Sequence, residues 1–147
     1  MRELTTSDIW QELEKFSEPI LGITINGVVN NNAAVMGRGI ALEAAQRDKT
    51  LPFVLGLLLN LKRNNLQVFF LQKRGILFFP VKYKWWEKAD LKLIEISTRQ
   101  LDSLARKHPE CTFLLPRPGC GNGRLTWQEV KPIVKNLPDN VIVFSRS

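Results

Sequence analysis

Apolar and polar positions along the chain form two kinds of pattern, short apolar runs and helical repeats. Short, mostly apolar runs predict buried β-strands at residues 20–26, 66–72, 76–82, 112–115 and 141–144. A helical repeat of apolar residues predicts helices at residues 8–16, 51–63, 88–107 and 126–136, and one that begins near residues 39–40. Because strands alternate with helices and the strand pair at 66–82 is adjacent, we expect a three-layer α/β/α fold with a mixed central sheet.

Local signals refine this outline at three places. Residues 73–75 (KRG) separate the two adjacent strands and predict a hairpin turn. Thr6 or Ser7 is expected to cap the first helix. Pro132 is expected in the first turn of the last helix, where a missing N–H is tolerated, unless that helix begins later than residue 126.

The segment with the most chemical information is residues 114–127, LLPRPGCGNGRLTW. It places Gly119, Gly121 and Gly123 between a predicted strand and a predicted helix. A backbone so free of side chains can direct several N–H groups at an anion, and a helix start favours negative charge. The segment therefore predicts a phosphate-binding turn. A tight strand-to-helix connection is the alternative, since glycine serves both purposes.

A second glycine loop, residues 25–42, precedes the helix that begins near residue 40. Gly37 and Gly39 let the backbone approach a diphosphate closely, and the asparagine amides at residues 30–32 suit ribose hydroxyls. A dinucleotide-binding turn is excluded, because residue 42 is Leu where GxGxxG needs glycine and no acidic ribose partner follows at the expected distance. Both loops follow strands, so we expect them at one rim of the sheet.

The composition is that of an ordinary globular domain with excess positive charge. The 147 residues are expected to form one domain over 1–147, with a net charge of +7 that attracts polyanions. Apolar runs are too short for a bilayer and the N-terminus lacks a signal-peptide core, so no membrane partner is expected. Cys111 and Cys120 have no metal-ligand spacing. We expect reduced thiols, a cytoplasmic monomer, no metal and no cofactor.

Much of the positive charge lies around two aromatic residues. Lys82, Lys84, Lys88 and Lys92 surround the Trp85–Trp86 pair. Cations that follow a phosphate backbone, together with rings that stack on bases, are typical of single-stranded nucleic-acid surfaces. We therefore predict nucleic-acid contact by Lys84, Trp85, Trp86 and Lys88. The alternative is a solvated helix start beside two tryptophans of the core.

The two loops together, with MGRGIAL in the first and PRPGCGNGRLTW in the second, resemble the macrodomain family of ADP-ribose-binding modules. The resemblance covers about residues 23–47 and 76–145. Within the family it is similar to the ADP-ribosyl hydrolase branch, which includes the terminal ADP-ribose glycohydrolases and the bacterial DNA ADP-ribosyl glycohydrolase antitoxins. The resemblance implies a macrodomain fold and ADP-ribose as the ligand.

The resemblance also implies which residues contact ADP-ribose. The first phosphate-facing loop would be Met36, Gly37, Arg38, Gly39 and Ile40, and the second Gly119, Cys120, Gly121, Asn122 and Gly123. Asn31 would face the distal ribose, and Phe144 would lie beside the adenine. Asp8, followed by Ile9, would receive the adenine amino group, although hardly any of the strand that normally precedes this aspartate is expected in MREL.

Lys82, in FFPVKYKWW, matches the position of the lysine on which this branch depends. Such a lysine can open the distal ribose through a Schiff base or polarise the bond that is cleaved. A neighbouring cation would tune its pKa, and Lys84 is the expected one. The alternative for Lys82 is a solvated lysine at the end of an edge strand.

Two positions depart from the family pattern. Gly123 stands where the human enzyme of this branch has an aspartate that assists release, and Thr126 stands where the bacterial enzymes have an aspartate before the tryptophan. Three functions therefore stay open: hydrolytic removal of ADP-ribose from an acceptor such as nucleic acid, non-catalytic binding of ADP-ribose, and an ADP-ribose 1″-phosphate phosphatase.

His108 is the sole histidine of the chain, and no Ser-His-Asp catalytic set is available. We expect His108 to be a helix C-terminal cap or a solvated residue.

Overall fold

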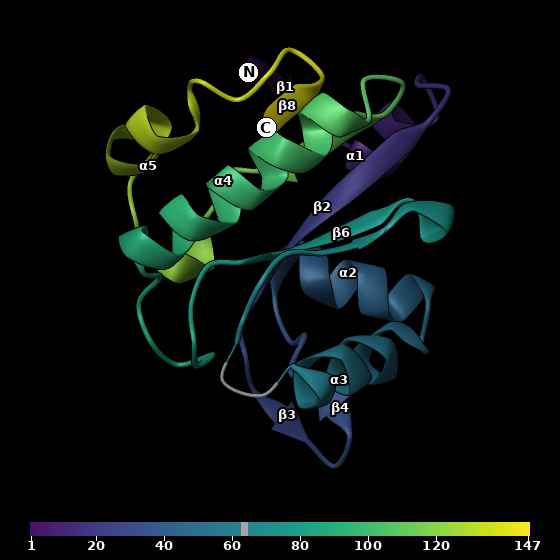
Figure 1. The fold of residues 1–147 in the computed structure, drawn as a ribbon, viewed down its shortest axis with the longest axis vertical. Coiled ribbons are helices and arrows are strands. Elements are labelled where there is room, and N and C mark those ends of the chain that lie inside the picture. The colour runs from purple at the N-terminus through teal and green to yellow at the C-terminus, as the bar shows by residue number, and fades with distance from the viewer. Residues whose placement is uncertain (63–64) are drawn as a thin grey trace.

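A mixed β-sheet forms the centre of the computed structural model, which describes residues 1–62 and 65–147 (Figure 1). Six strands of these residues pair in the order β1-β8-β7-β2-β6-β5. Their bounds are Arg2–Thr6 (β1), Pro19–Ile25 (β2), Phe69–Leu71 (β5), Ile76–Pro80 (β6), Thr112–Pro116 (β7) and Val141–Arg146 (β8). All neighbours are parallel except β5 and β6, so the predicted mixed sheet is confirmed.

The antiparallel pair is the predicted hairpin. Phe69 lies opposite Phe78, and a single 3-10 turn, Gln72–Arg74, connects β5 to β6. Gly75 ends this turn with φ 67°, a left-handed conformation that glycine adopts without a steric penalty. A second, two-stranded hairpin joins Val29–Asn30 (β3) to Ala33–Ala34 (β4) inside the segment predicted as a loop.

Helices cover both faces of the sheet, as predicted for a three-layer fold. They are Ile9–Leu13 (α1), Gly39–Arg47 (α2), Leu51–Leu61 (α3), Leu91–Lys107 (α4) and Trp127–Val134 (α5). Figure 1 shows α4 and α5 on one side of the sheet and α2 and α3 on the other. A hydrophobic core lies on each face of the sheet, and successive residues of a strand point to opposite faces. Phe79 packs in the core under α4 and α5, whereas Phe78 packs in the core with α1, α2 and α3.

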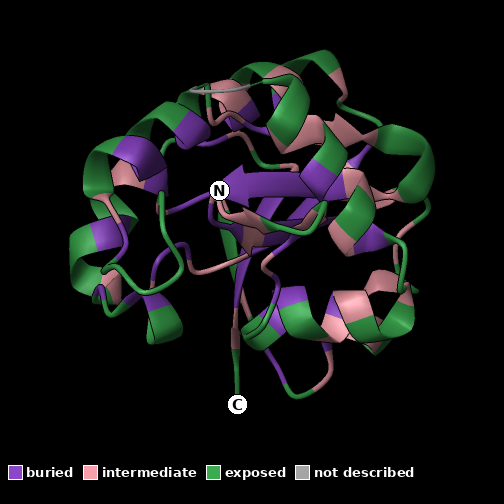
Figure 2. Cartoon of the chain, turned by 90° about the horizontal axis from the view of Figure 1, so that it is seen from below, coloured by how far each residue is buried: buried purple, intermediate pink, exposed green. Residues whose placement is uncertain are grey.

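The burial pattern follows from this layering. In Figure 2 the strands are mostly buried, while the helices have buried stripes towards the sheet and exposed outer faces. This is the amphipathic arrangement that the helical repeat of apolar residues predicts. Among the helices of the described residues, none combines the length and apolarity needed to cross a membrane.

The start of the chain differs from the sequence-based expectation. β1 is a full strand, and Leu4 lies opposite Phe144 of β8. It is an edge strand with only Thr6 fully buried, so its sequence RELTT has little apolar signal, and the ladder with β8 supplies its order. The cap of α1 is Asp8 rather than Thr6 or Ser7, since the Asp8 side chain accepts from the N–H groups of Trp10 and Gln11.

Two helix ends also need correction. α5 begins at Trp127, so Pro132 is its sixth residue and lies beyond the first turn. Its missing N–H removes the bond to the carbonyl of Gln128, and the helix ends soon afterwards at Val134. α3 ends at Leu61, and Arg63, the predicted last residue of that helix, lies outside the described residues.

Candidate functional site

A cavity of about 780 Å³ lies at the carboxyl ends of β2, β6, β7 and β8. Both glycine loops contribute to it, so the prediction that they share one rim is confirmed. The lining residues outside these loops come from strand ends and from the segment after β6. The lining consists of Thr24, Ile25, Asn26, Val35, Met36, Gly37, Arg38, Gly39, Ile40, Ala41, Val81, Lys82, Trp85, Pro116, Arg117, Gly119, Cys120, Gly121, Asn122, Gly123, Phe144, Ser145 and Arg146.

The first glycine loop presents the start of α2 to this cavity. Gly37, Arg38 and Gly39 are exposed, and no side chain caps the helix. The first N–H groups of α2 are therefore available to an anion, which the helix dipole also favours. Asn26 holds this loop in place: its Nδ2 donates to the carbonyl of Val35 over 3.1 Å, and its Oδ1 accepts from the Val28 N–H over 2.9 Å.

The second loop follows β7 and contains a 3-10 turn, Gly121–Gly123. Gly119 and Gly121 both have φ 73°, but they differ in their surroundings. A Cβ on Gly119 would lie within 3 Å of the side chains of Ile94, Leu125 and Ala89, whereas a Cβ on Gly121 would meet nothing within 4 Å. Gly119 therefore permits close packing, and Gly121 keeps the cavity open. The loops meet where a Cβ on Gly39 would lie 3.5 Å from Asn122 Nδ2.

Lys82 lines the cavity and is half-buried. Burial lowers the pKa of its ammonium group, and the positive charges of Arg124 and then Arg38 lower it further. The cations that act on Lys82 are thus these two arginines rather than the predicted Lys84. Lys84 instead lies with its Nζ 5.5 Å from the ring centre of Trp86. The alternative of a fully solvated lysine at the end of an edge strand is wrong.

The segment that carries Lys82 is hydrogen-bonded to both sides of the cavity. The N–H of Val81 donates to the carbonyl of Ile25 at the end of β2, and the carbonyl of Tyr83 accepts from Gly27. At its other end, the N–H of Ala89 donates to the carbonyl of Gly123 over 2.9 Å. Residues 81–89 therefore connect the first loop to the second, which fixes the position of Lys82 between them.

All charged side chains among the described lining residues are cations: Arg38, Lys82, Arg117 and Arg146. Two of them form ion pairs with carboxylates outside the lining. Arg146 donates to both carboxylate oxygens of Glu43, at 2.6 and 3.0 Å, and Arg117 lies 3.9 Å from a carboxylate oxygen of Glu3. Within the described residues, Arg38 and Lys82 have no ion pair, so their charge remains for a ligand.

Three predicted ligand residues do not line the cavity. Asp8 uses Oδ1 to cap α1, and Ile9, the first residue of that helix, is fully buried in the core. Asn31 lies at the exposed tip of the β3–β4 hairpin, where it and Asn32 have φ of 51° and 66°, the two positive values of a type I′ turn. Phe144 does line the cavity, but its side chain is only 2% exposed.

The basic aromatic segment lies beside the cavity rather than in the core. Trp85 is 48% and Trp86 56% exposed, so the alternative of two core tryptophans is wrong. Trp85 lines the cavity, whereas Trp86, Lys84 and Lys88 lie outside the lining and are exposed. The two rings meet edge to face with centres 5.3 Å apart.

The two departures from the family pattern have local explanations. Thr126 is the N-cap of α5 and forms a capping box with Glu129, a role that aspartate fills equally well. Gly123 is buried, and a Cβ there would lie 2.9 Å from the Cβ of Ala89. Position 123 therefore has no room for a larger side chain in this arrangement.

Sequence reasoning missed several lining residues, namely Thr24, Ile25, Asn26, Val35, Ala41, Val81, Pro116, Arg117, Ser145 and Arg146. Most of them end a parallel strand or follow one. The rule that ligands gather at carboxyl ends of strands could have found Asn26, Arg117 and Arg146. Which of these side chains form ion pairs depends on Glu3 and Glu43, which are distant in the sequence.

No family model and no curated protein sequence matches this chain. Solved structures, in contrast, do match this chain. The chain has the fold of the macrodomain of Mycobacterium tuberculosis DarG (23% identity, TM-score 0.73, 99% of each chain) and of the macrodomain of Thermus aquaticus DarG (22% identity, TM-score 0.74, 99% of this chain and 97% of that one). It also matches Thermosipho africanus DarTG in complex with ADP-ribose, at 20% identity and TM-score 0.68.

The match to Thermosipho africanus DarTG covers 88% of this chain but only 38% of the Thermosipho africanus chain. At these identities the likeness is one of fold. The predicted macrodomain fold is confirmed, and the structures that share it include DarG macrodomains.

Proposed function

We propose that this protein binds ADP-ribose in the cavity between its two glycine loops and removes ADP-ribose hydrolytically from a modified acceptor. The observation that carries the proposal is the cationic cavity itself. An uncapped helix start, an open Gly121 and the unpaired charges of Arg38 and Lys82 all face the same space. This is the environment that a diphosphate requires. A neighbour of the same fold, Thermosipho africanus DarTG, has been solved with ADP-ribose.

The proposed placement of the ligand follows from the lining. The diphosphate lies between residues 37–40 and residues 119–123, and the adenine lies towards Phe144. The distal ribose then points to the segment after β6, where Lys82 is held. Asn26, which the sequence did not single out, keeps the first loop in the shape that this placement needs.

Lys82 is the proposed catalytic residue. Burial and two arginines lower the pKa of Lys82. At a given pH, Lys82 is therefore a neutral amine in a larger fraction of the protein molecules than an ordinary lysine would be. A neutral amine can attack the anomeric carbon, and the acceptor atom leaves with a proton. Water then adds to the same carbon, the Lys82 amine leaves, and free ADP-ribose is released. If Lys82 acts as an ammonium ion instead, it donates its proton to the departing acceptor atom while water attacks.

The proposed acceptor is nucleic acid. Trp85 stands at the edge of the cavity and is half-exposed, so its ring is available to stack on a base. Lys84 and Lys88 lie in the same exposed segment and can contact the phosphate backbone. A protein acceptor would not need this combination of rings and cations.

A non-catalytic ADP-ribose-binding function is the second candidate, and one observation favours it. Within the described lining of the cavity there is no carboxylate, and position 123 is filled by contact with Ala89. No acidic side chain therefore stands ready to assist water. The phosphatase alternative needs a nucleophile or acid–base pair at the terminal phosphate, and the described lining offers no histidine or carboxylate for it.

The test is direct comparison of acceptors. The protein is incubated with ADP-ribosylated single-stranded DNA, ADP-ribosylated RNA and ADP-ribosylated protein, and free ADP-ribose is measured over time. Release from nucleic acid alone supports the proposal in full. Binding of ADP-ribose by calorimetry with no release from any acceptor would instead establish the non-catalytic function.

A further inference from the structure

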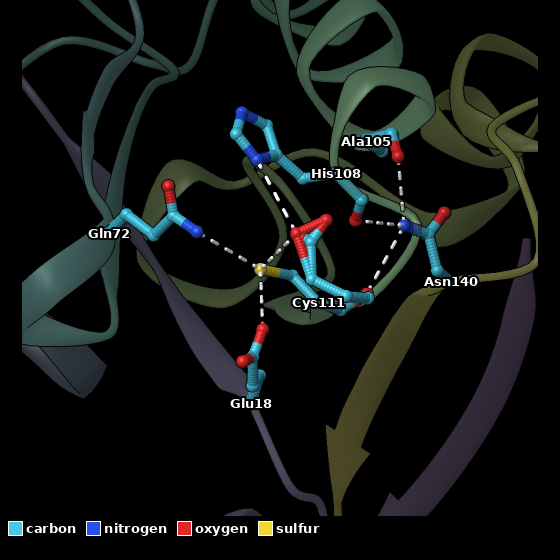
Figure 3. Close-up of polar contacts among 7 residues, drawn as sticks. Glu18, Gln72, Ala105, His108, Cys111 and Asn140 are labelled. Atoms are coloured by element: carbon cyan, nitrogen blue, oxygen red, sulfur yellow. Dashed lines mark hydrogen bonds and ion pairs between the residues drawn. The ribbon is translucent and has the colours of Figure 1, made fainter.

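A second group of chemically capable side chains lies at the opposite rim of the sheet (Figure 3). His108, Glu110 and Cys111 stand between the end of α4 and the start of β7, and Glu18 directly precedes β2. The cavity with the glycine loops is at the other ends of these strands. β7 has five residues, so the two places are separated by about 15 Å of strand.

The donor atoms of this group converge on the sulfur of Cys111. Its Sγ lies 3.9 Å from Glu18 Oε2 and 4.0 Å from Glu110 Oε2. The Nδ1 of His108 lies 3.7 Å from Glu110 Oε2. One donor atom each from His108, Glu110 and Cys111 lie within 4.8 Å of one another. Figure 3 shows Glu18 approaching Cys111 from the opposite side to His108.

One ion can bring the donor atoms of His108, Glu110 and Cys111 together. With Zn–S bonds of about 2.3 Å and Zn–N or Zn–O bonds of about 2.0–2.1 Å, the ligand atoms of a tetrahedral zinc site lie about 3.3–3.6 Å apart. The three donor atoms lie within 4.8 Å of one another, so side-chain rotations close the difference when an ion binds. One thiolate, one imidazole and one carboxylate form a mixed donor set that suits Zn²⁺ better than Mg²⁺ or Ca²⁺, which prefer oxygen alone.

The backbone that carries these side chains is held firmly. Asn140 donates through one nitrogen to the carbonyls of Ala105, His108 and Cys111, at 2.9, 3.1 and 3.2 Å (Figure 3). The N–H of Thr112 donates to the carbonyl of Glu18 over 3.0 Å, which brings Glu18 beside Cys111. The ring of His108 packs edge-on against Phe70 with centres 5.1 Å apart. The donor set is therefore largely preorganised.

The charge distribution also favours a cation. Two carboxylates approach one sulfur atom, and among the ion pairs of the described residues neither Glu18 nor Glu110 is paired with lysine or arginine. A second cavity of about 540 Å³ reaches the thiol. Its lining includes Glu18, Gln72 and Cys111 together with two cations, Lys73 and Arg74, of which Arg74 is paired with Asp48. A bound Zn²⁺ would neutralise the Glu110 carboxylate and the thiolate together.

We propose that Cys111, His108 and Glu110 bind one Zn²⁺ ion at the junction of α4 and β7, beside the Glu18 carboxylate that precedes β2. Three coordination positions are taken by protein, and water completes the tetrahedron. Because this site lies at the opposite ends of the strands from the glycine-loop cavity, the ion stabilises the fold and takes no part in chemistry there.

Metal titration of the intact, metal-stripped protein tests the proposal. Added Co²⁺ should bind at one ion per chain and give a thiolate-to-metal charge-transfer band. Zn²⁺ should abolish this band by competition, and at hundredfold excess over its Kd it should raise Tm by about 5–10 °C. Cys111→Ser should lose the charge-transfer band, whereas the matched control Cys120→Ser, which changes the other free cysteine, should keep it.

Glu110→Gln and His108→Gln provide a second line of evidence that does not alter the buried thiol. Each should weaken Co²⁺ binding at least about tenfold, while circular dichroism confirms that the variants are folded. Absence of a thiolate band in the wild-type protein, or its retention in Cys111→Ser, would overturn the proposal. So would unchanged Co²⁺ affinity in both the Glu110 and the His108 variants.

Discussion

Ala89 and Gly123 are in contact through both backbone and side-chain positions. The Ala89 N–H donates to the Gly123 carbonyl over 2.9 Å, and a Cβ placed on Gly123 would lie 2.9 Å from the Cβ of Ala89. The segment that carries Lys82 therefore docks on the second glycine loop where side chains are missing, since a Cβ on Gly119 would also lie 2.9 Å from the Cβ of Ala89. Gly123, which departs from the family pattern, permits this docking together with Gly119.

A side chain at position 123 should consequently harm the protein. We expect Gly123→Asp to lower the free energy of unfolding by about 1–3 kcal/mol, because overpacking forces residues 82–89 away from the loop. The variant should also release ADP-ribose more slowly than the wild type, since Lys82 moves with that segment. Thermal unfolding and release assays measure the two effects. Ser103→Asp is the control, because it adds the same side chain at an exposed position of α4 outside the cavity. Faster release by Gly123→Asp would contradict this account.

ADP-ribose should bind with micromolar affinity, on the order of 8 kcal/mol. Gly121→Glu should abolish the binding, because the new side chain enters the cavity and repels the diphosphate. Calorimetry measures both proteins, with Ser103→Glu as a control that adds the same charge at an exposed position of α4. No heat from the wild type at millimolar ADP-ribose would rule out the cavity as its site.

Lys82 should separate binding from catalysis. Lys82→Ala removes the amine but leaves the helix start and the second loop intact, so ADP-ribose affinity should fall by less than about tenfold, roughly 1.4 kcal/mol. Hydrolysis should fall at least ~100-fold, the usual scale for a positioned catalytic group. Calorimetry and single-turnover release give the two numbers. Equal hydrolysis by variant and parent would show that Lys82 is not the catalyst.

The pH dependence should distinguish the two chemical roles of Lys82. Burial, Arg124 and Arg38 lower its pKa, so the neutral amine becomes the major form at a lower pH than for an ordinary lysine. If the amine is the nucleophile, kcat rises with pH and levels off above that lowered pKa. Arg124→Gln removes a positive charge and should move this rise to higher pH. A rate that falls as Lys82 deprotonates would assign the ammonium role instead.

Salt should weaken the complex with modified single-stranded DNA far more than the complex with free ADP-ribose. If Lys84 and Lys88 contact phosphates, replacing both by Gln should reduce the slope of log K against log salt by about 1.4. The control is the pair Lys107→Gln and Lys135→Gln, exposed lysines at the ends of α4 and α5. Equal slopes for the two ligands would mean that the segment around Trp85 is only a solvated surface.

Local patterns were sufficient to predict the framework of this protein. The short apolar runs of the strands, the helical repeat between them and the turn at residues 73–75 predicted a mixed sheet in three layers, because these signals depend on neighbours in the sequence. The glycine loops were visible for the same reason, since each combines a strand end, glycines and a helix start within a short segment. β1 was not visible, because an edge strand with a polar exposed side leaves little apolar signal.

Only the tertiary structure decided which side chains act on one another. The sequence placed Lys84 beside Lys82, whereas the cations that lower the pKa of Lys82 are Arg124 and Arg38, brought there by separate loops. It placed Asp8 at the ligand, whereas the carboxylate caps α1. It offered no partner for Cys111, whereas the sheet sets Glu18 beside it. Electrostatic and coordinating contacts depend on distances in space, and parallel strands bring together residues that are dozens of positions apart in the chain.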